Sequence, residues 1–282
     1  MTPAAKLLAQ DARRRFAALV RHADTPIDPG RAALLIAAEE APRVCVAHYL
    51  ALLDEMGTQA RTRIDRHLGS PIAALNQYLF EDLGFAGNRH HYYDPHNSLL
   101  HYVLERRTGI PITLSIVYME VGRRAGIPVE GVGLPGHFIV RARPDAGDAI
   151  LVDPFNGQII DEETCQQRLD MNYGGQVPLG EEHLRATPTR DILVRLLRNL
   201  KAIYAQAQLF GRALAVVERI LLLSPQAPDE HRDRGLLLAQ RKRLPEAILE
   251  LQTYLRLAEQ STDGDRVREE LKKLQIELAM LN

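Results

Sequence analysis

Two side chains able to do acid–base chemistry, His137 and Asp153, lie on short runs of β-forming residues in the middle of the chain. The runs span 129–132, 137–141 and 150–152, and the glycines and prolines between them are typical of strands joined by turns. A carboxylate can orient an imidazole, and an oriented imidazole can take a proton from a nearby thiol or hydroxyl. His137 and Asp153 are therefore the candidate centre of a catalytic or ligand-binding site.

A helix is predicted just before these strands. Pro111 fits the first helical position, where the missing N–H of proline costs nothing. Gly126 favours the left-handed conformation that often ends a helix. Between them, apolar residues recur at helical spacing: Leu114, Val117, Tyr118, Val121 and Ala125. We expect this helix to pack on the strands and to position the candidate centre.

Few residues could serve as a nucleophile for His137. Ser115 lies one turn beyond Pro111 on the predicted helix, but an alcohol requires a base within about 2.6 to 3.2 Å. Its alternative role is a buried hydroxyl bonded back to the helix carbonyls. The two cysteines, Cys45 and Cys165, fall in other predicted helices and are interpreted as buried or half-buried structural thiols. Two cysteines give no disulfide framework and suit a reducing cytosol.

The segment 84–107 has the most unusual composition in the chain. Four of its residues invite a metal interpretation: His90, His91, His96 and His101. Their spacing matches no zinc motif, so neither a metal nor another cofactor is expected. Because loops carry sites that a scaffold positions, this polar loop is predicted to border the pocket. Asn97 or Ser98 is expected to cap a helix running to Arg107.

The remaining elements of the N-terminal part are predicted to be mostly helical. Apolar periodicity indicates helices at 3–22, 31–40, 44–64 and 72–83. Arg13, Arg14 and Arg15 form a solvated face of the first of these helices. A short helix at 161–169 follows the strands, with Asp161 as its cap. The segment 172–190 is rich in glycine, proline and threonine, which indicates a boundary between domains at 1–187 and 188–282.

The C-terminal part shows one helical pattern twice. Ala213 aligns with Ala247, 34 residues further on, which is the period of the tetratricopeptide helix-turn-helix. The same offset relates three further pairs: Ala205 with Ala239, Leu209 with Arg243, and Ser224 with Ala258. A last helix at about 263–281 has apolar residues on one face and fits a capping helix. Stacked helix pairs generate concave surfaces, so this tail is predicted to bind a protein or peptide partner.

Composition narrows the cellular context. The 282 residues are 46% hydrophobic and 25% charged, as in ordinary globular proteins, and the net charge is −1. A charge near zero gives no overall attraction to nucleic acid or to an anionic membrane. No stretch approaches the roughly 18 to 20 apolar residues that span a bilayer, and the N-terminus lacks the features of a secretory signal. We expect a cytoplasmic protein with no direct nucleic-acid or membrane partner.

The region from Gly109 to Asp153 resembles the transglutaminase-like, papain-related superfamily. In that superfamily a cysteine opens a helix, a histidine lies on the next strand and an aspartate on the strand after it. HFIV, beginning at His137, and LVDPFNG match these strands, and GRRAGIPVEGVG matches the helix end and the following strand. Alignment of the helix back from Gly126 places the cysteine position at Pro111. The resemblance implies an α+β fold, with a helix-rich core and a small antiparallel sheet, followed by an all-α repeat tail.

The chain is also similar, more specifically, to the bacterial SirB-type family. This family joins a transglutaminase-like core to tetratricopeptide repeats, and its members are described as invasion-gene regulators. The similar runs are NRHHYYDPHNSLLHYVLERRTGIPITLS and GVGLPGHFIV, together with LVDPFNG and the repeats. The core further resembles a region of a eukaryotic F-box protein, which is a context of partner binding.

These observations favour a regulatory adaptor whose transglutaminase-like site lacks the cysteine nucleophile. The helix start at Pro111 would still offer free N–H groups to an anion. The candidate ligand contacts are Asn97, His137, Asp153 and Asn156. Two alternatives remain: a purely structural histidine–aspartate pair that satisfies buried polar groups, and a hydrolase or transferase of peptide amide bonds with a non-standard nucleophile.

Overall fold

The computed structural model describes residues 2–21, 26–67, 69–144, 148–258 and 261–281. The chain divides into two compact units, residues 1–193 and 194–282. Helix α8 (Thr189–Gln206) runs from one unit into the other. The predicted domain boundary between residues 187 and 188 falls just before this helix. The exact position of the boundary stays a prediction.

The first unit begins with three helices, α1 (Pro3–Val20), α2 (Pro29–Glu40) and α3 (Val46–Arg66). The side chains of Thr2 and Asp28 accept hydrogen bonds from the first turns of α1 and α2, and a proline follows each cap. Most of α2 is buried, whereas α1 and α3 bury one apolar stripe each. The predicted helices at 3–22, 31–40 and 44–64 therefore correspond to real helices.

The predicted helix at 72–83 is two segments, α4 (Pro71–Asn76) and a π-helix, η1 (Gln77–Asp82). Within the π-helix the N–H of Leu83 donates to the carbonyl of Tyr78, five residues back, at 3.0 Å. Phe80 stacks on the ring of Tyr118 at a centroid distance of 6.0 Å. Apolar periodicity does not distinguish a π-turn from an α-turn, which is why one continuous helix was expected.

Helix α6 (Pro111–Arg124) forms the centre of the first unit. Eleven of its residues are buried, so it packs on all sides, against α3 and against the sheet. A short 3-10 turn, η2 (Pro95–Ser98), and helix α5 (Leu100–Arg106) precede it. Leu99, and neither Asn97 nor Ser98, occupies the N-cap of α5, because the 3-10 turn already includes both polar residues. That capping prediction was wrong.

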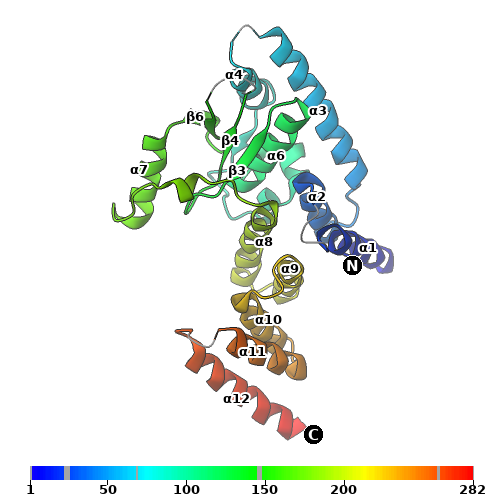
Figure 1. The fold of residues 1–282 in the computed structure, drawn as a ribbon. Helices are drawn as coiled ribbons and strands as arrows, with labels where there is room; N and C mark the ends of the chain where they lie inside the picture. The colour runs from blue at the N-terminus through cyan, green and yellow to red at the C-terminus, as the bar shows by residue number, and fades with distance from the viewer. Residues whose placement is uncertain (1, 22–25, 68, 145–147, 259–260, 282) are drawn as a thin grey trace. The chain divides into compact units, whose positions relative to one another are not determined.

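The main sheet is an antiparallel meander with the strand order β3–β4–β5–β6. Its strands are β3 (Val129–Val132), β4 (Ile139–Ala142), β5 (Ile150–Asp153) and β6 (Gln158–Ile160). Gly131 pairs with Val140, and Val140 pairs with Val152. The fourth strand was not predicted. In Figure 1 the sheet lies between α7 (Glu162–Tyr173) on one side and α6 on the other.

Two smaller pairings complete the first unit. β1 (Ala86–Gly87) and β2 (Thr108–Gly109) form a two-residue parallel pair that ties the histidine-rich loop to the start of α6. The N–H of Thr187 donates to the carbonyl of Gly131 at 2.8 Å, beyond a 3-10 turn, η3 (Glu181–Leu184). The glycine-rich segment before α8 therefore packs on the edge of the sheet at β3.

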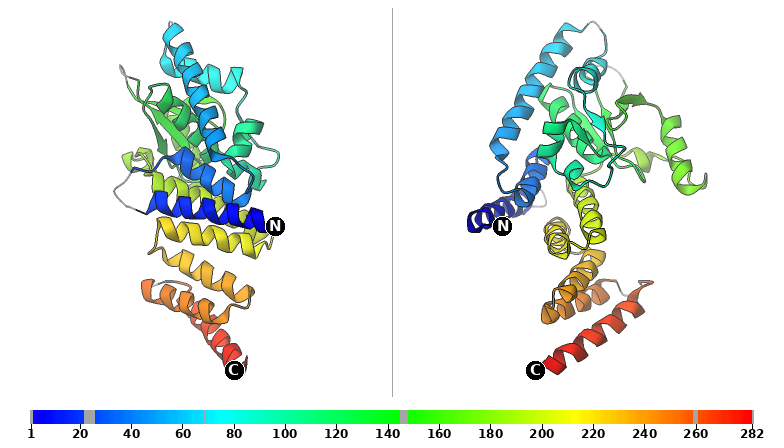
Figure 2. Two further views of the ribbon diagram at one scale, coloured as in Figure 1. Left: turned by 90° about the vertical axis from the view of Figure 1, so that its right-hand side faces the viewer. Right: turned by 180° about the vertical axis from the view of Figure 1, so that it is seen from behind.

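The second unit is a stack of helices in which each contacts the next: α9 (Phe210–Leu223), α10 (Pro228–Gln240), α11 (Leu244–Leu257) and α12 (Gly264–Leu281). Figure 2 shows α9 to α12 following one another from yellow to red. Helices α9 and α11 begin and end 34 residues apart, as the repeat predicts. Gln208 and Lys242 both adopt positive φ, at 55° and 58°. Ala213 and Ala247 are both fully buried, which lets neighbouring helices approach closely.

Candidate functional site

The Asp153 carboxylate is the centre of the candidate site. It ends strand β5, is fully buried and accepts from donors on both oxygens. Oδ1 lies 3.0 Å from Nε2 of His137 and accepts the N–H groups of Phe155 and Asn156 at 3.0 and 3.3 Å. Oδ2 accepts the Asn156 side-chain amide at 2.6 Å and pairs with the guanidinium of Arg168. The structure thus brings together three of the predicted site residues, His137, Asp153 and Asn156.

This set of partners controls the ionisation of Asp153. Burial by itself raises the pKa of a carboxyl group. Hydrogen bonding and charge from His137, the charge of Arg168 and the hydrogen bond from Asn156 outweigh that effect and lower the pKa of Asp153 to about 2. Asp153 is therefore a buried anion whose charge is balanced by the groups around it.

Local backbone geometry presents these partners to Asp153. His137 does not lie on the strand, as the sequence predicted, but in the turn two residues before β4, where its N–H donates to the Leu134 carbonyl at 3.1 Å. Gly136 has a φ of +71°, which a residue with a side chain would adopt only under strain. After β5, Gly157 has a φ of +68° and packs against Phe80 of the π-helix. Both turns are thus fixed by glycines.

The histidine-rich loop borders this centre, in agreement with the prediction. The N–H of Gly87 donates to the Phe155 carbonyl at 3.1 Å, and the Arg89 guanidinium donates to the side-chain oxygen of Asn156. The rings of Tyr92 and Phe155 make an edge contact with centroids 6.2 Å apart.

Asn97 has a different role from the one predicted. Its side-chain N–H groups donate to the carbonyls of His91 and Tyr92 at 2.7 and 3.2 Å, and its oxygen accepts from Asn88 at 3.0 Å. The side chain is buried and its polar atoms are used within the loop. Asn97 therefore orders the loop that carries Arg89, and its assignment as a ligand contact remains a prediction.

Pro111 begins helix α6 and is buried. Two turns of this helix carry two hydroxyls with opposite environments. Thr113 accepts from the Ile110 N–H at 3.1 Å and donates to the Asn97 carbonyl at 2.7 Å, which joins the helix start to the loop. Ser115 is fully buried, and within the described chain its oxygen has no hydrogen-bond partner, neither His137 nor a helix carbonyl. The expected bond from Ser115 back to the helix was wrong.

The two cysteines differ from each other in exposure. Cys165 is buried on α7 against Val132, Leu134 and Ile139, and burial raises the pKa of its thiol to about 11. Its structural interpretation is confirmed. Cys45 occupies the N-cap of α3 and is exposed, which corrects the expectation of a buried or half-buried thiol. The side chain stands at the start of the helix, directly after a turn.

The histidines of the loop do not converge. His96 contacts Asp94, at 2.6 Å between Nδ1 and Oδ1, and His101 is buried against the ring of Tyr49. Burial lowers the pKa of His101 to about 4, so it is neutral at physiological pH. Within the ranges that the structure describes, no three histidine, cysteine, aspartate or glutamate side chains are grouped as metal ligands.

Sequence reasoning missed three residues of the site: Arg89, Phe155 and Arg168. Phe155 belongs to the run DPFNG, whose turn after a strand was visible in the sequence. Arg168 had no such signal, since it reaches Asp153 from a separate helix, α7. Arg168 lies one turn beyond Cys165 on α7. Only the burial of Cys165 shows that this face of the helix points toward the sheet.

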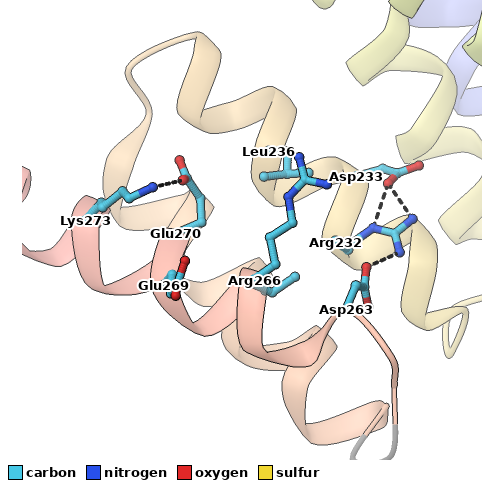
Figure 3. Close-up of a pocket in the computed structure, with 9 residues that line it drawn as sticks. Arg232, Asp233, Leu236, Asp263, Arg266, Glu269, Glu270 and Lys273 are labelled. Carbon is cyan, nitrogen blue, oxygen red and sulfur yellow. Dashed lines mark hydrogen bonds and ion pairs between the residues drawn. The ribbon is translucent and has the colours of Figure 1, made fainter.

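The second unit contains a charged pocket of about 650 Å³ between α10 and α12. Arg232 pairs with Asp233 and with Asp263, at 3.1 and 2.7 Å, and Lys273 pairs with Glu270 at 3.5 Å. Figure 3 shows the Arg266 side chain between these two groups, directed toward Leu236. Among the described residues, no ion pair involves Arg266. Beside these ion pairs, the pocket thus presents the Arg266 guanidinium and the Glu269 carboxylate, for which no ion pair is formed among the described residues.

Comparison with known proteins identifies the superfamily to which the chain belongs. A family described as the transglutaminase-like superfamily matches residues 47–198, and the tetratricopeptide repeat matches residues 200–272. The chain belongs to the transglutaminase-like superfamily and continues into tetratricopeptide repeats, so the predicted helix-rich α+β fold with a repeat tail is confirmed. Among described residues, no helix has the length and apolar character required to cross a membrane.

The more specific family follows from individual relatives. The chain is 41% identical to the UPF0162 protein of Xylella fastidiosa over 248 residues, which cover 86% of this chain and 88% of that protein. It is 27% identical to protein SirB1 of Salmonella typhimurium over 195 residues, 69% of this chain and 72% of that protein. The chain belongs to this SirB-type family. F-box only protein 21 of Mus musculus is 41% identical over 101 residues, 33% of this chain and 16% of that protein.

Proposed function

We propose that this protein is a regulatory adaptor. Its repeat unit docks a protein partner, and its transglutaminase-like unit binds without catalysing thiol transfer. Pro111 begins the helix at the position where the superfamily resemblance places the cysteine, and proline has no nucleophilic side chain. The proposed localisation is the cytoplasm, with no direct contact to nucleic acid or membrane.

The contact between Arg168 and Asp153 is the observation that carries this proposal. In a catalytic arrangement the carboxylate orients the imidazole and stabilises the imidazolium that forms during proton transfer. Here Arg168 already supplies a positive charge to Asp153. The carboxylate is therefore shared between Arg168 and His137 and does not serve the imidazole alone. The arrangement favours a rigid binding surface over proton transfer.

The pocket between α10 and α12 is the proposed partner surface. Arg266 extends into it with no carboxylate partner in the described chain, while the pairs around Arg232 keep the frame in place. A guanidinium that meets an acidic side chain on a partner forms a charge-assisted hydrogen bond without first losing another one. Partner binding through this pocket therefore requires little rearrangement of the repeat unit.

The full-length chain tests the docking surface directly. Arg266→Glu reverses one charge in the pocket, and Arg268→Glu reverses an exposed charge on the same helix, where Arg268 pairs with the exposed Asp265. We expect affinity capture followed by quantitative mass spectrometry to show partners retained by the wild type and by Arg268→Glu but lost with Arg266→Glu. Equal recovery with both variants would place the partner elsewhere.

A second experiment tests the alternative function, a hydrolase or transferase of peptide amide bonds. Wild-type protein and His137→Ala are incubated with glutamine-containing peptides and a primary amine, and the peptides are analysed by mass spectrometry. We expect no cleavage and no amine incorporation above the level of His137→Ala. Product that forms only with the wild type would establish a hydrolase or transferase and would end the adaptor proposal.

A further inference from the structure

Phe155 lies at the junction of the histidine-rich loop and the Asp153 turn. Its ring makes edge contacts with His137 and Tyr92, each at a centroid distance of 6.2 Å, and the guanidinium carbon of Arg89 lies 5.7 Å from its centre. The phenyl ring is only partly buried, and Arg89 is exposed. An aromatic surface beside an exposed cation is thus present at the rim of the candidate site.

Arg89 is held in place but its charge is not compensated. Its guanidinium donates to the side-chain oxygen of Asn156, which is a neutral acceptor, and no carboxylate pairs with it in the described part of the chain. Asn156 cannot turn freely, because its amide nitrogen donates to Asp153 at 2.6 Å. Asp153, the nearest anion in this chain of contacts, is itself balanced by Arg168. The rim of the site is therefore positive.

The loop that carries Arg89 is ordered from both sides. Asn88 donates to Asn97 at 3.0 Å and accepts the N–H of His91 at 3.0 Å. Thr113 on α6 donates to the Asn97 carbonyl at 2.7 Å. A side chain at position 87 would meet the ring of Phe155 at 2.5 Å, so glycine there permits the close approach of loop and ring. Ordering of this kind lowers the entropic cost of binding a ligand.

We propose that Arg89 and Phe155, whose ring lies beside His137, form a binding site for the C-terminal residue of a partner peptide. The guanidinium would bind the terminal carboxylate through parallel N–H groups, a geometry that suits arginine. An apolar side chain on the same terminal residue would pack on the ring of Phe155. This inference rests on the proposed adaptor function and specifies the ligand chemistry of its transglutaminase-like unit.

The test compares three probes on the full-length protein by NMR titration: N-acetyl-Ala-Ala-Phe with a free carboxylate, the same peptide as its C-terminal amide, and N-acetyl-Ala-Glu-Phe amide, which moves the charge to a side chain. We expect the free acid to bind at least about tenfold more tightly than the amide, because only the acid forms the charge-assisted contact. The internal glutamate should not restore binding.

Matched variants assign the effect to Arg89. Arg89→Gln should weaken binding of the free acid about tenfold and leave the amide unchanged, whereas Arg89→Lys should give an intermediate loss, since lysine keeps the charge but not the planar fork. Arg14→Gln removes an equal charge at an exposed position of α1 and should have no effect. Unchanged thermal unfolding of Arg89→Gln shows that the fold is intact.

Equal binding of acid and amide, or equal binding by wild type and Arg89→Gln, would overturn the carboxylate site and leave the adaptor proposal standing. Binding of the glutamate probe as tightly as the free acid would overturn the assignment to a chain terminus. Failure of the adaptor proposal has a separate readout, the His137-dependent product described above.

Discussion

Arg168 pairs with Oδ2 of Asp153, the carboxylate oxygen opposite to the one that faces His137. One buried anion therefore joins an arginine on α7 to a histidine in the turn before β4. Arg168 and His137 both depend on the Asp153 carboxylate. Substitution of any of these three residues should therefore lower the free energy of unfolding.

Removal of Arg168 should destabilise the first unit. Arg168→Met leaves the buried Asp153 with one charged partner fewer, and loss of a hydrogen bond to a buried charged group costs about 1–3 kcal/mol. We expect a decrease of that size in the free energy of unfolding, measured by urea denaturation. Arg14→Met, at a side chain that is 78% exposed, serves as the control and should change it by less than about 0.5 kcal/mol.

Asp153 should also make stability depend on acid pH. Its pKa is lowered in the folded state from 3.8 to about 2, so the folded form holds the charged carboxylate more strongly than the unfolded form does. The resulting stability is complete above about pH 5 and is lost as the pH falls through 4 toward 2. At about 1.4 kcal/mol per unit, it amounts to roughly 2 kcal/mol. Unfolding of wild type and Asp153→Asn from pH 2.5 to pH 6 measures it: the variant should be less stable at pH 6 but have the flatter profile.

The two thiols should differ in reactivity. Exposed Cys45 should be alkylated by iodoacetamide in the native protein, while Cys165, buried and with a pKa raised to about 11, should react only after unfolding. Intact-mass spectrometry of wild type and Cys45→Ser distinguishes the sites. The rate at Cys45 should be the same in His137→Ala. A rate that falls without His137 would instead mark Cys45 as an activated nucleophile.

The hydroxyls of Thr113 and Ser115 on α6 provide a matched pair. Ser115→Ala removes a buried hydroxyl that has no hydrogen-bond partner among the described residues, so the free energy of unfolding should stay constant or rise by up to about 1 kcal/mol. Thr113 lies on the opposite face of the helix. Thr113→Ala removes its hydrogen bonds to Ile110 and Asn97 and should lower the free energy of unfolding by about 1–2 kcal/mol. Chemical denaturation measures both. A large loss from Ser115→Ala would show that this hydroxyl has a structural partner after all.

The sequence predicted features that depend on local order in the chain. The 34-residue offset located the equivalent ends of α9 and α11, because both repeats use the same small residues, Ala213 and Ala247, at the same point of contact. His137 and Asp153 were expected near each other because both were assigned to neighbouring antiparallel strands and to matching positions of the transglutaminase-like superfamily. The two side chains do meet, although His137 lies in the turn before β4 and not on the strand.

Other features depend on tertiary packing and could not be obtained in this way. Arg168 reaches Asp153 only because α7 folds back on the sheet, and no periodicity encodes that direction. Cys45 was misassigned because burial at a helix start depends on which element covers it. Strand β6 has only three residues, with two of them exposed, so it lacks the alternation that indicates a strand.

The π-helix at 77–82 has a consequence for how side chains are aimed. Each α-helical residue turns the chain by about 100°, and a π-turn holds roughly one residue more. Deletion of a single residue there would restore the ordinary turn and rotate Phe80 away from Tyr118 and Gly157. The turn that carries Asn156 would then lose its contact with the Phe80 ring. The extra residue of the π-helix thus sets the direction in which Phe80 points, and through Phe80 it supports the turn that follows Asp153.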